Sequence, residues 1–528
     1  MKKDCLCYQG LNEEYFDLLL EKYKNAQKDL NFAHIHPVSV ASSDLLQELP
    51  YANYEDLKID KKELLALAKS ATLWIKKMQA GVGSSISRTT YLAKKRGLTP
   101  EKIKLGCKGT DLFAEIDGKD VSIAELQLLQ AIYDAEQGFY SKVVMQDIVS
   151  DETMASIRDL WNLKCFFESN RTYEDIFSNN KKLGKFGEIC QKHQATIDAK
   201  GELSTNRTSP GGHGLIGISA LRACYKENER PNKNVENLIG VVGNGEDLGS
   251  SPDPLIVGWM IKNKVPVAMI TTEKTELDMK GGQIALVDDG SGTVYITIIE
   301  KAQAENAGKL DLFEQMGLRP GDRPAFFNTN TAVFNYQELT PIVNELIQKM
   351  GENEFMRAVS PDLIKNTKKQ VDKDGVERVY VQLEGAMGSS LLNFDKLCRQ
   401  KLGKKAVHFL NIEKKNRTRF FTPIKTAFDF LLQFHSDVFS LDVQTMRLNN
   451  NHISGVLPAV TLKDKYYDDV ENVLTSFSGT KMSHLEKLYI QGKARLCGAE
   501  LVGDVEIVNT KNDIYDIQGR VENKKIRR

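Results

Sequence analysis

Length, composition and charge set the first limits on what this chain can be. Its 528 residues are enough to bury a large core and to form more than one domain. The 71 basic and 71 acidic side chains cancel, which argues against nucleic acid or an anionic membrane as a partner, so any anion must be bound locally. The eight cysteines lack paired zinc spacing and indicate reduced thiols. Together with the lack of a long apolar run or signal peptide, they predict a cytoplasmic protein.

The first part of the chain carries apolar residues at helical spacing, over 12–30 and again over 62–78. This pattern predicts a helical region up to about residue 70. Further along, short apolar segments alternate with amphipathic helices, which is typical of an α/β fold with a mainly parallel sheet. The clearest segments are the expected strands at 142–145, 238–242 and 265–271 and the expected helix at 123–136.

Turn sequences predict two hairpins, one at Asp289-Gly290-Ser291-Gly292 and one at Asp374-Gly375, because these residues favour positive φ. Near the C-terminus, short β-prone triplets recur between Gly492, Gly498 and Gly503, a pattern that indicates a few β-helix coils. We therefore expect three parts: a helical region over 1–70, an α/β domain over 71–435, and a C-terminal domain over 436–528.

Two adjacent carboxylates, Glu246 and Asp247, follow the apolar run 238–242. An apolar run that stops at glycine and acidic residues is typical of a buried parallel strand ending at the rim of an open sheet, where α/β proteins bind ligands. Such a pair can hold Mg²⁺ on a phosphate. The alternative is structural: the pair caps a helix, and Asp253 caps the next segment.

A glycine-rich stretch, Lys77-Met78-Gln79-Ala80-Gly81-Val82-Gly83-Ser84-Ser85, can turn several backbone N–H groups toward one anion. It lacks the spacing of the P-loop and of the dinucleotide fingerprint, so an ordinary turn fits equally well. The residues that follow are rich in cations, which suits phosphates but also suits a solvated basic loop. These cations are Arg88, Lys94, Lys95, Arg96, Lys102, Lys104 and Lys108.

A second glycine-rich stretch, Ser209-Pro210-Gly211-Gly212-His213-Gly214, lets the backbone approach a planar ligand while the imidazole offers a donor. A surface histidine in a loop is the alternative.

Five further motifs then occur in a fixed order along the chain. They are Lys274-Thr275-Glu276-Leu277-Asp278-Met279-Lys280-Gly281-Gly282, Glu300-Lys301-Ala302-Gln303, Phe327-Asn328-Thr329-Asn330, Gln382-Leu383-Glu384-Gly385-Ala386-Met387-Gly388, and Arg417-Thr418-Arg419-Phe420-Phe421-Thr422-Pro423-Ile424-Lys425-Thr426.

In order and approximate spacing, these motifs resemble those of the eukaryotic-type UDP-glucose pyrophosphorylases, and the chain is identified as a divergent member from about residue 70 to the end. The resemblance implies a Rossmann-like nucleotidyltransferase domain, a mixed sheet with helices on both faces, and a C-terminal left-handed β-helix. It also implies a reaction in which glucose 1-phosphate attacks the α-phosphorus of UTP and releases pyrophosphate. UTP and a sugar 1-phosphate are the implied partners, and Mg²⁺ is the implied cofactor.

Such a reaction needs in-line positioning and charge neutralisation, and no covalent enzyme intermediate. This agrees with motifs rich in glycine, lysine and carboxylates that lack a nucleophile and base pair.

The resemblance assigns roles to individual residues. Lys108 is the implied triphosphate lysine, and Lys425 holds the sugar phosphate or the α-phosphate; for Lys425 alone, a surface lysine is the alternative. The implied nucleotide contacts are Ala80, Gly81, Gly83, Asn170 and Gly212. The implied sugar contacts are His213, Gly282, Glu300, Asn328 and Asn330.

The chain departs from the family pattern at three places. Glu246-Asp247 stands where the family usually has Asp-Asn, so either Glu246 or Asp247 binds the metal. Asn170 stands where a glutamine commonly reads uracil, and the loop after Gly83 is longer than in the family. These departures keep two other hypotheses open: a related pyrophosphorylase with another sugar or base, and a silent nucleotide-sugar binder. A homo-oligomer formed through the C-terminal coils is also possible.

Overall fold

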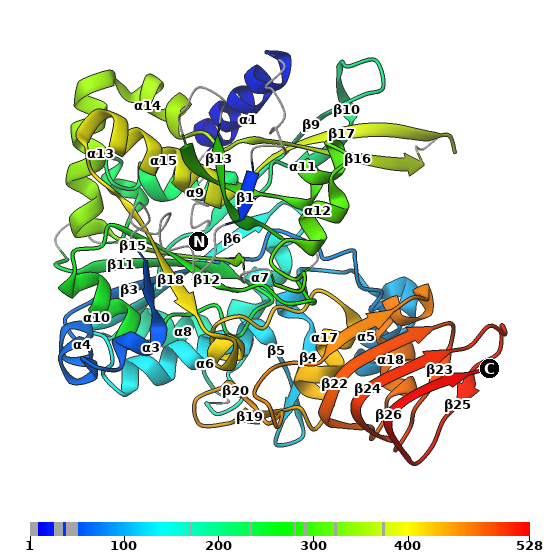
Figure 1. Cartoon of the computed structure of the whole chain (residues 1–528). Coiled ribbons are helices and arrows are strands. Elements are labelled where there is room, and N and C mark those ends of the chain that lie inside the picture. Colours follow the sequence, from blue (N-terminus) through cyan, green and yellow to red (C-terminus); the bar gives the residue numbers. More distant parts are fainter. Residues whose placement is uncertain are drawn as a thin grey trace.

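The computed structural model describes residues 9–25, 35–37, 51–168, 170–231, 235–278, 281–288, 294–321, 325–371 and 375–528. Figure 1 shows an α/β body, with the C-terminal domain (orange to red) to one side of it. Among the helices of these residues, none is both long enough and apolar enough to cross a membrane.

A large mixed sheet lies at the centre of the α/β body (Figure 1). Its main path runs, in spatial order, through β2 (Tyr51–Asn53), β18 (Val407–Ile412), β12 (Val267–Glu273), β15 (Phe326–Asn335), β11 (Leu238–Asn244), β3 (Thr72–Met78), β6 (Lys142–Ser150) and β7 (Leu183–Lys185). Beside this path lie β1 (Ile35–Pro37), β8 (Ile189–Gln191), β13 (Gln283–Asp288) and β14 (Val294–Ile299). Pairing is parallel except around β13, β14 and β15, which confirms the predicted α/β fold with a mixed sheet.

Helices cover both faces of this sheet, and each face has its own apolar core. One face packs against α4 (Lys61–Ala68), α6 (Ile123–Glu136), α7 (Met154–Trp161), α8 (Tyr173–Asn179) and α10 (Pro254–Lys262). The other packs against α1 (Gln9–Lys24), α9 (Gly214–Arg222), α13 (Tyr336–Met350), α14 (Glu352–Val359) and α15 (Met387–Leu402). Because β11 is sandwiched in this way, every one of its residues is buried.

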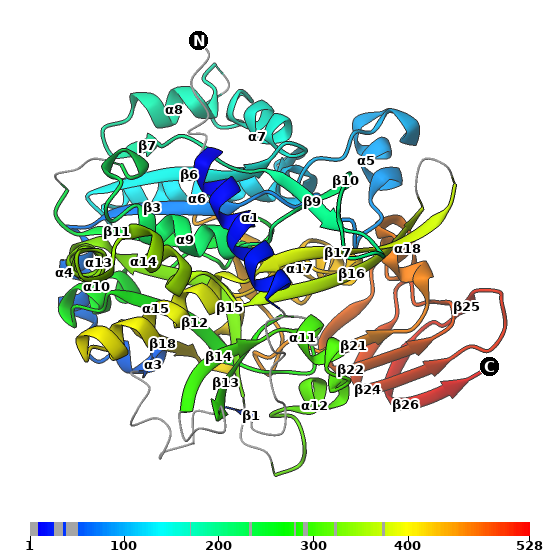
Figure 2. The ribbon, with the colours of Figure 1, turned by 90° about the horizontal axis from the view of Figure 1, so that it is seen from above.

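A second, antiparallel sheet continues from the α/β body. Its order is β10 (Leu203–Pro210), β9 (His193–Ile197), β17 (Glu377–Gly385) and β16 (Leu363–Val371). Helix α1 lies across β17 and α9 (Figure 2), and the Tyr15 hydroxyl donates to the Gly211 carbonyl at 2.7 Å. The N-terminal helix therefore supports the loop that leads to Gly212.

Both predicted hairpins are confirmed as antiparallel pairs, β13 with β14 and β16 with β17. The turn at Asp289-Gly290-Ser291-Gly292 lies outside the described residues, as does Asp374. Gly375 is described and has the expected positive φ of 79°. Asp253 also caps a helix as expected: its carboxylate accepts from Leu255 N at 3.0 Å, at the start of α10.

Helix α17 (Ala427–Phe434) precedes the expected boundary at 436 and packs into one apolar core with the C-terminal strands. The C-terminal domain then contains β19 (Phe439–Asp442) and β20 (Arg447–Asn450). It continues with β21 (Ala459–Leu462), α18 (Val470–Ser476), β22 (Lys481–Gln491), β23 (Ala494–Arg495), β24 (Glu500–Val508), β25 (Tyr515–Asp516) and β26 (Arg520–Arg527). Strands β21, β22, β24 and β26 pair in parallel, as stacked coils do, and a left-handed winding stays a prediction. The outer strand β26 carries Lys524, Lys525 and Arg527. Such charges hinder edge pairing, and a homo-oligomer stays a prediction.

The predicted helical pattern over 62–78 is wrong in its second half, because α4 ends at Ala68 and β3 begins at Thr72. Lys76 and Lys77 give this segment the appearance of an amphipathic helix with a charged face. In the structure both lysines are buried, so the segment has no solvent-exposed face. Lys76 lies 3.6 Å from the centre of the Trp74 ring, and Lys77 donates to the Ser250 carbonyl at 3.0 Å. The strand β2 also shows that residues before 70 are not entirely helical, because it extends the central sheet.

Candidate active site

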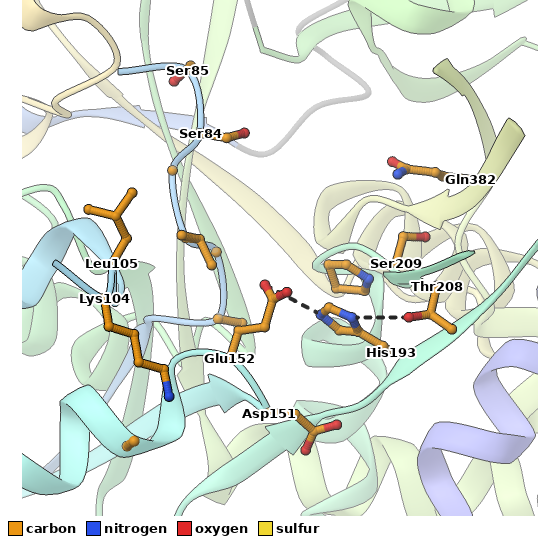
Figure 3. Close-up of a pocket in the computed structure, with 16 residues that line it drawn as sticks. Ser84, Ser85, Lys104, Leu105, Asp151, Glu152, His193, Thr208, Ser209 and Gln382 are labelled. Carbon is orange, nitrogen blue, oxygen red and sulfur yellow. Dashed lines mark hydrogen bonds and ion pairs between the residues drawn. The ribbon is translucent and has the colours of Figure 1, made fainter. Parts of the chain in front are cut away.

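A pocket of about 990 Å³ opens beside the first glycine-rich stretch (Figure 3). Residues Ala80 to Ser85 form one wall, and His193 with Thr208 to Pro210 form the wall opposite. Asp151 and Glu152, Lys104 and Leu105, Ala155 and Gln382 complete the lining. This volume is large enough for a nucleotide. The structure therefore places the predicted contacts Ala80, Gly81 and Gly83 on the wall of a pocket.

Gly83 is the point at which this wall meets the phosphate lysine. It has a φ of 71°, which favours glycine. A Cβ atom at this position would lie 2.6 Å from Cγ of Lys108, so the backbone and the lysine stem are in close contact. At Gly81, by contrast, a Cβ atom would meet nothing within 4 Å. Of these two glycines, only Gly83 is required for reasons of space.

Replacing Gly83 by alanine should raise KM for UTP and lower kcat by about tenfold or more, because the new methyl group displaces Lys108. Gly97→Ala is a matched control, since Gly97 has a φ of 62° but a Cβ atom there would meet nothing within 4 Å. Both variants should lose about 1 kcal/mol of stability from backbone strain. Steady-state kinetics decide the question: equal kinetic effects in the two variants would contradict the proposed contact.

The ammonium groups of Lys108 and Lys425 meet at the carboxylate of Glu246. Lys425 Nζ lies 2.5 Å from Glu246 Oε1, and Lys108 Nζ lies 3.6 Å from the same oxygen. Lys108 also donates to the Ile424 carbonyl at 2.5 Å. Burial alone would raise the pKa of Glu246, but the charges of Lys425 and then Lys108 outweigh it and lower the pKa to about 2. Glu246 is therefore ionised at neutral pH. Burial lowers the pKa of Lys108, whereas the charge of Glu246 outweighs burial at Lys425 and raises its pKa. Two ammonium groups beside one ionised carboxylate suit a phosphate.

Asp247 forms different contacts from those of Glu246, and its side chain is completely buried. Its Oδ1 accepts from the backbone N–H of Thr422 and of Gly249, each at 2.9 Å. Its Oδ2 is buried with no hydrogen-bond partner. Burial raises the pKa of Asp247 to about 6, although these hydrogen bonds and the charge of Lys77 act in the opposite direction. Asp247 therefore fixes the loop, and it is Glu246 that faces the lysines. Neither residue caps a helix.

Mg²⁺ fits this arrangement through Glu246. In the described part of the chain, no group of three or more His, Cys, Asp or Glu side chains could hold a metal ion. Mg²⁺ needs no such cage, since it is commonly bound by one or two carboxylates together with substrate phosphates. Glu246 is 15% exposed and can offer one carboxylate beside a bound phosphate. The metal site stays a prediction, and the geometry favours Glu246 over Asp247.

The second glycine-rich stretch leads into α9. Gly212 has a φ of 78°, and a Cβ atom there would lie 2.7 Å from the Gly385 carbonyl oxygen. Nδ1 of His213 accepts from the Met387 N–H at 2.9 Å. Burial, and then the charge of Lys425, lower the pKa of His213 to about 4. The imidazole is therefore neutral, with its proton on Nε2, and it offers one donor, as the sequence predicts.

The structure brings Gly282, Glu300, Asn328 and Asn330 together. The Gly282 carbonyl accepts from Asn328 N at 2.9 Å, and Asn328 Nδ2 donates to Asn330 Oδ1 at 2.9 Å. A Cβ atom at Gly282 would lie 2.7 Å from Oε1 of Glu300. That oxygen is buried and has no hydrogen-bond partner. Burial, and then the charge of Glu384, raise the pKa of Glu300 to about 7. These residues make a polar cluster with an unsatisfied carboxyl oxygen, which suits a sugar hydroxyl.

Replacing Glu300 by alanine should raise KM for glucose 1-phosphate by about 10- to 100-fold, because a hydrogen bond to a carboxyl group is lost. KM for UTP should change little. Glu305→Ala, which removes an exposed carboxylate from the same helix α11 (Lys301–Asn306), is the control and should leave both values unchanged. A rise in KM for UTP alone would place Glu300 in the nucleotide site and contradict this role.

Asn170 does not reach the pocket wall. It is exposed in a turn after α7 and is not among the residues that line the pocket. A different amide lies beside Gly212: Gln191, at the end of β8, is buried and donates through Nε2 to the Gly212 carbonyl. Like Asn170, Gln191 and Gly212 are not among the residues that line the pocket, so the contact to the base stays a prediction. The sequence analysis missed Gln191 because a three-residue strand gives almost no periodic signal.

The sequence analysis also missed residues that hold the acidic loop in place. Gln127 on α6 donates to the carbonyl oxygens of Gly245 at 3.2 Å and of Asp247 at 3.1 Å. Lys77 holds Ser250 and Ser251. Both side chains are buried. The one signal in the sequence that could have identified them is a polar residue inside an apolar segment.

Together, the mixed sheet, the glycine-lined pocket and the cluster of two lysines with one carboxylate define the nucleotidyltransferase class. A model of the UTP--glucose-1-phosphate uridylyltransferase family matches residues 179–499, more than half of the chain, so the chain belongs to this family.

Individual relatives are distant. The chain is 23% identical over 418 residues to a probable UTP--glucose-1-phosphate uridylyltransferase of Schizosaccharomyces pombe, covering 78% of this chain and 72% of the relative. It is 22% identical over 370 residues to the Saccharomyces cerevisiae enzyme, covering 69% of this chain but only 63% of that relative, less than two thirds of its length.

Solved structures confirm the fold over almost the whole chain. A UDP-glucose pyrophosphorylase variant from Leishmania major, in complex with UDP-glucose, superimposes with a TM-score of 0.68 and 19% identity, covering 98% of this chain and 96% of that one. A UDP-glucose phosphorylase from Trypanosoma brucei gives a TM-score of 0.69 at 19% identity, with the same coverage.

Proposed function

We propose that this chain catalyses the reaction of its family, in which UTP and glucose 1-phosphate form UDP-glucose and pyrophosphate. The observation that carries the proposal is the meeting of Lys108 and Lys425 at Glu246, beside the pocket lined by Ala80, Gly81 and Gly83. These residues come from distant parts of the chain, and both ammonium groups meet at the same carboxylate oxygen. A cytoplasmic role in carbohydrate metabolism is part of the same proposal.

The chemistry follows from this arrangement. A phosphate oxygen of glucose 1-phosphate attacks the α-phosphorus of UTP, and the bond from that phosphorus to the bridging oxygen of the β-phosphate breaks, so that pyrophosphate leaves. Lys425 is about half exposed, so it can exchange its ion pair with Glu246 for the attacking phosphate or the α-phosphate. Lys108 is buried at the loop that faces the nucleotide, where it neutralises charge on the departing pyrophosphate.

Mg²⁺, when bound, would neutralise charge on the phosphates, and Glu246 is the residue that would hold it. The sugar is held by Glu300, Asn328 and His213, which offer acceptors and a neutral donor. Since Asn328 and Oε1 of Glu300 are buried, a sugar that lacks a matching hydroxyl leaves them unpaired and binds poorly.

A related pyrophosphorylase with another sugar or base is the second candidate. It is favoured by the position of Asn170, which does not line the pocket, and by Glu246 in the place of the family's aspartate. A panel of sugar 1-phosphates and nucleoside triphosphates, compared by kcat/KM, separates the candidates. The proposal predicts the highest value for UTP with glucose 1-phosphate. A higher value for another pair would contradict it, whereas UDP-glucose binding without turnover, even with Mn²⁺, would indicate a silent binder.

A further inference from the structure

The stretch between Gly83 and Lys108 connects the glycine loop to the phosphate lysine. The position of Lys108 relative to the loop therefore depends on how the two ends of this stretch are held. It contains α5 (Thr89–Arg96), and it is anchored from outside by the C-terminal domain. Ser87 N donates to the Asp468 carbonyl at 2.9 Å, and the Ser87 hydroxyl donates to the Asp469 carboxylate at 2.7 Å. The backbone around residue 87 is therefore fixed independently of the glycine loop.

One side chain inside this stretch binds both of its ends. Arg88 is completely buried. Its guanidinium donates to the carbonyl of Val82 at 2.7 Å and of Gly83 at 3.0 Å, and also to the carbonyl of Gly106 at 3.0 Å. Its Nε donates to the buried carboxylate of Asp111. The planar guanidinium thus uses donors on all three nitrogens in one fixed geometry, which a lysine cannot reproduce.

Stability alone does not explain this arrangement, because a buried ion pair is often no more stable than apolar side chains of the same size. Its geometry does have a consequence for the phosphate site. Arg88 holds Gly83, the backbone of Gly83 packs against the stem of Lys108, and Nζ of Lys108 lies 3.6 Å from Oε1 of Glu246. A continuous set of contacts therefore runs from the guanidinium to the phosphate lysine.

We propose that Arg88 is a positioning residue for the phosphate site: by binding the carbonyls of Val82, Gly83 and Gly106, it fixes the glycine loop against Lys108. Its effect on turnover rests on the proposed function. Its effect on the loop does not, because the contacts are made by the protein alone.

The test compares Arg88→Lys with Arg399→Lys in the full-length protein. Arg399 is the matched control because it forms an ion pair with Asp395 at 2.5 Å on α15, outside the stretch. Amide hydrogen exchange over 81–85 and 105–108 should be about tenfold faster in Arg88→Lys and unchanged in Arg399→Lys. In the same preparations, kcat/KM for UTP should fall about 10- to 100-fold in Arg88→Lys only.

Unchanged exchange and unchanged kcat/KM in a folded Arg88→Lys protein would overturn the proposal. If Arg88→Lys does not fold, Asp111→Asn takes its place, since it weakens one contact and keeps the three carbonyl bonds. It should accelerate exchange in the same two segments by a few fold and in no other segment, and equal exchange in all segments would overturn the role. An unmodified protein without turnover would contradict the proposed function instead, while the exchange data would still decide the role of Arg88.

Discussion

Replacing Lys425 by alanine should lower kcat by about 100- to 1,000-fold, because the variant lacks a cation placed against charge that develops in the transition state. The structure gives this lysine a defined position: its Nζ lies 2.5 Å from Glu246, and its backbone N–H donates to Asp429 at 2.9 Å. Steady-state kinetics with UTP and glucose 1-phosphate measure the effect. Turnover at the unmodified rate would show that Lys425 is only a surface lysine.

Lys463→Ala is the control for this variant, since Lys463 is an exposed lysine of the C-terminal domain. It should leave kcat and both KM values unchanged. Lys425→Arg adds a second comparison. It keeps the charge but spreads it over a planar group, and it should recover part of the activity if charge neutralisation is the main contribution.

Replacing the two carboxylates of the acidic loop, Glu246 and Asp247, by amides should have different effects on turnover. Glu246→Gln should lower kcat by about 100-fold and raise the Mg²⁺ concentration needed for half-maximal turnover, because the variant lacks the carboxylate that forms ion pairs with both lysines. Asp247→Asn should keep most of the activity. Titration of turnover against Mg²⁺ for both variants checks this assignment. Loss of activity in Asp247→Asn with normal Mg²⁺ dependence in Glu246→Gln would reverse it.

Asp247→Asn should also change how stability depends on pH. The folded protein holds the pKa of Asp247 at about 6, above its ordinary value of 3.8. The contribution of the protonated Asp247 carboxyl group to the free energy of unfolding is therefore fully present below pH 3.8, and it is lost as pH rises through about 6. An asparagine does not ionise and so lacks this loss. The free energy of unfolding of the variant, relative to that of the unmodified protein, should therefore rise by about 1 kcal/mol from pH 5 to pH 8. Urea unfolding at the two pH values measures this gain, and an equal difference at both would contradict the buried charge.

Local signals in the sequence were enough to predict several elements. The helix at 123–136 was predicted with its observed limits, and the structure shows a capping box at Ser122 and Glu125 that marks its start. The strand expected at 238–242 appears as β11, because a run buried on both faces needs no alternation. The hairpins followed from turn chemistry.

Other features depend on contacts that spacing does not reveal. Lys76 and Lys77 look like solvated charges in the sequence and are buried in the structure, so β3 was mistaken for helix. The pairing of Glu246 with Lys425 joins residues far apart in the chain, and neither spacing nor the order of the family motifs predicted this contact. Arg88 was counted as one cation of a basic loop, whereas its role comes entirely from three carbonyl groups.

The most direct test of the central claim is release of pyrophosphate by the purified protein with UTP, glucose 1-phosphate and Mg²⁺. We expect sustained release that requires all three components, with UDP-glucose formed in equal amount. No release from the folded protein under these conditions would contradict it.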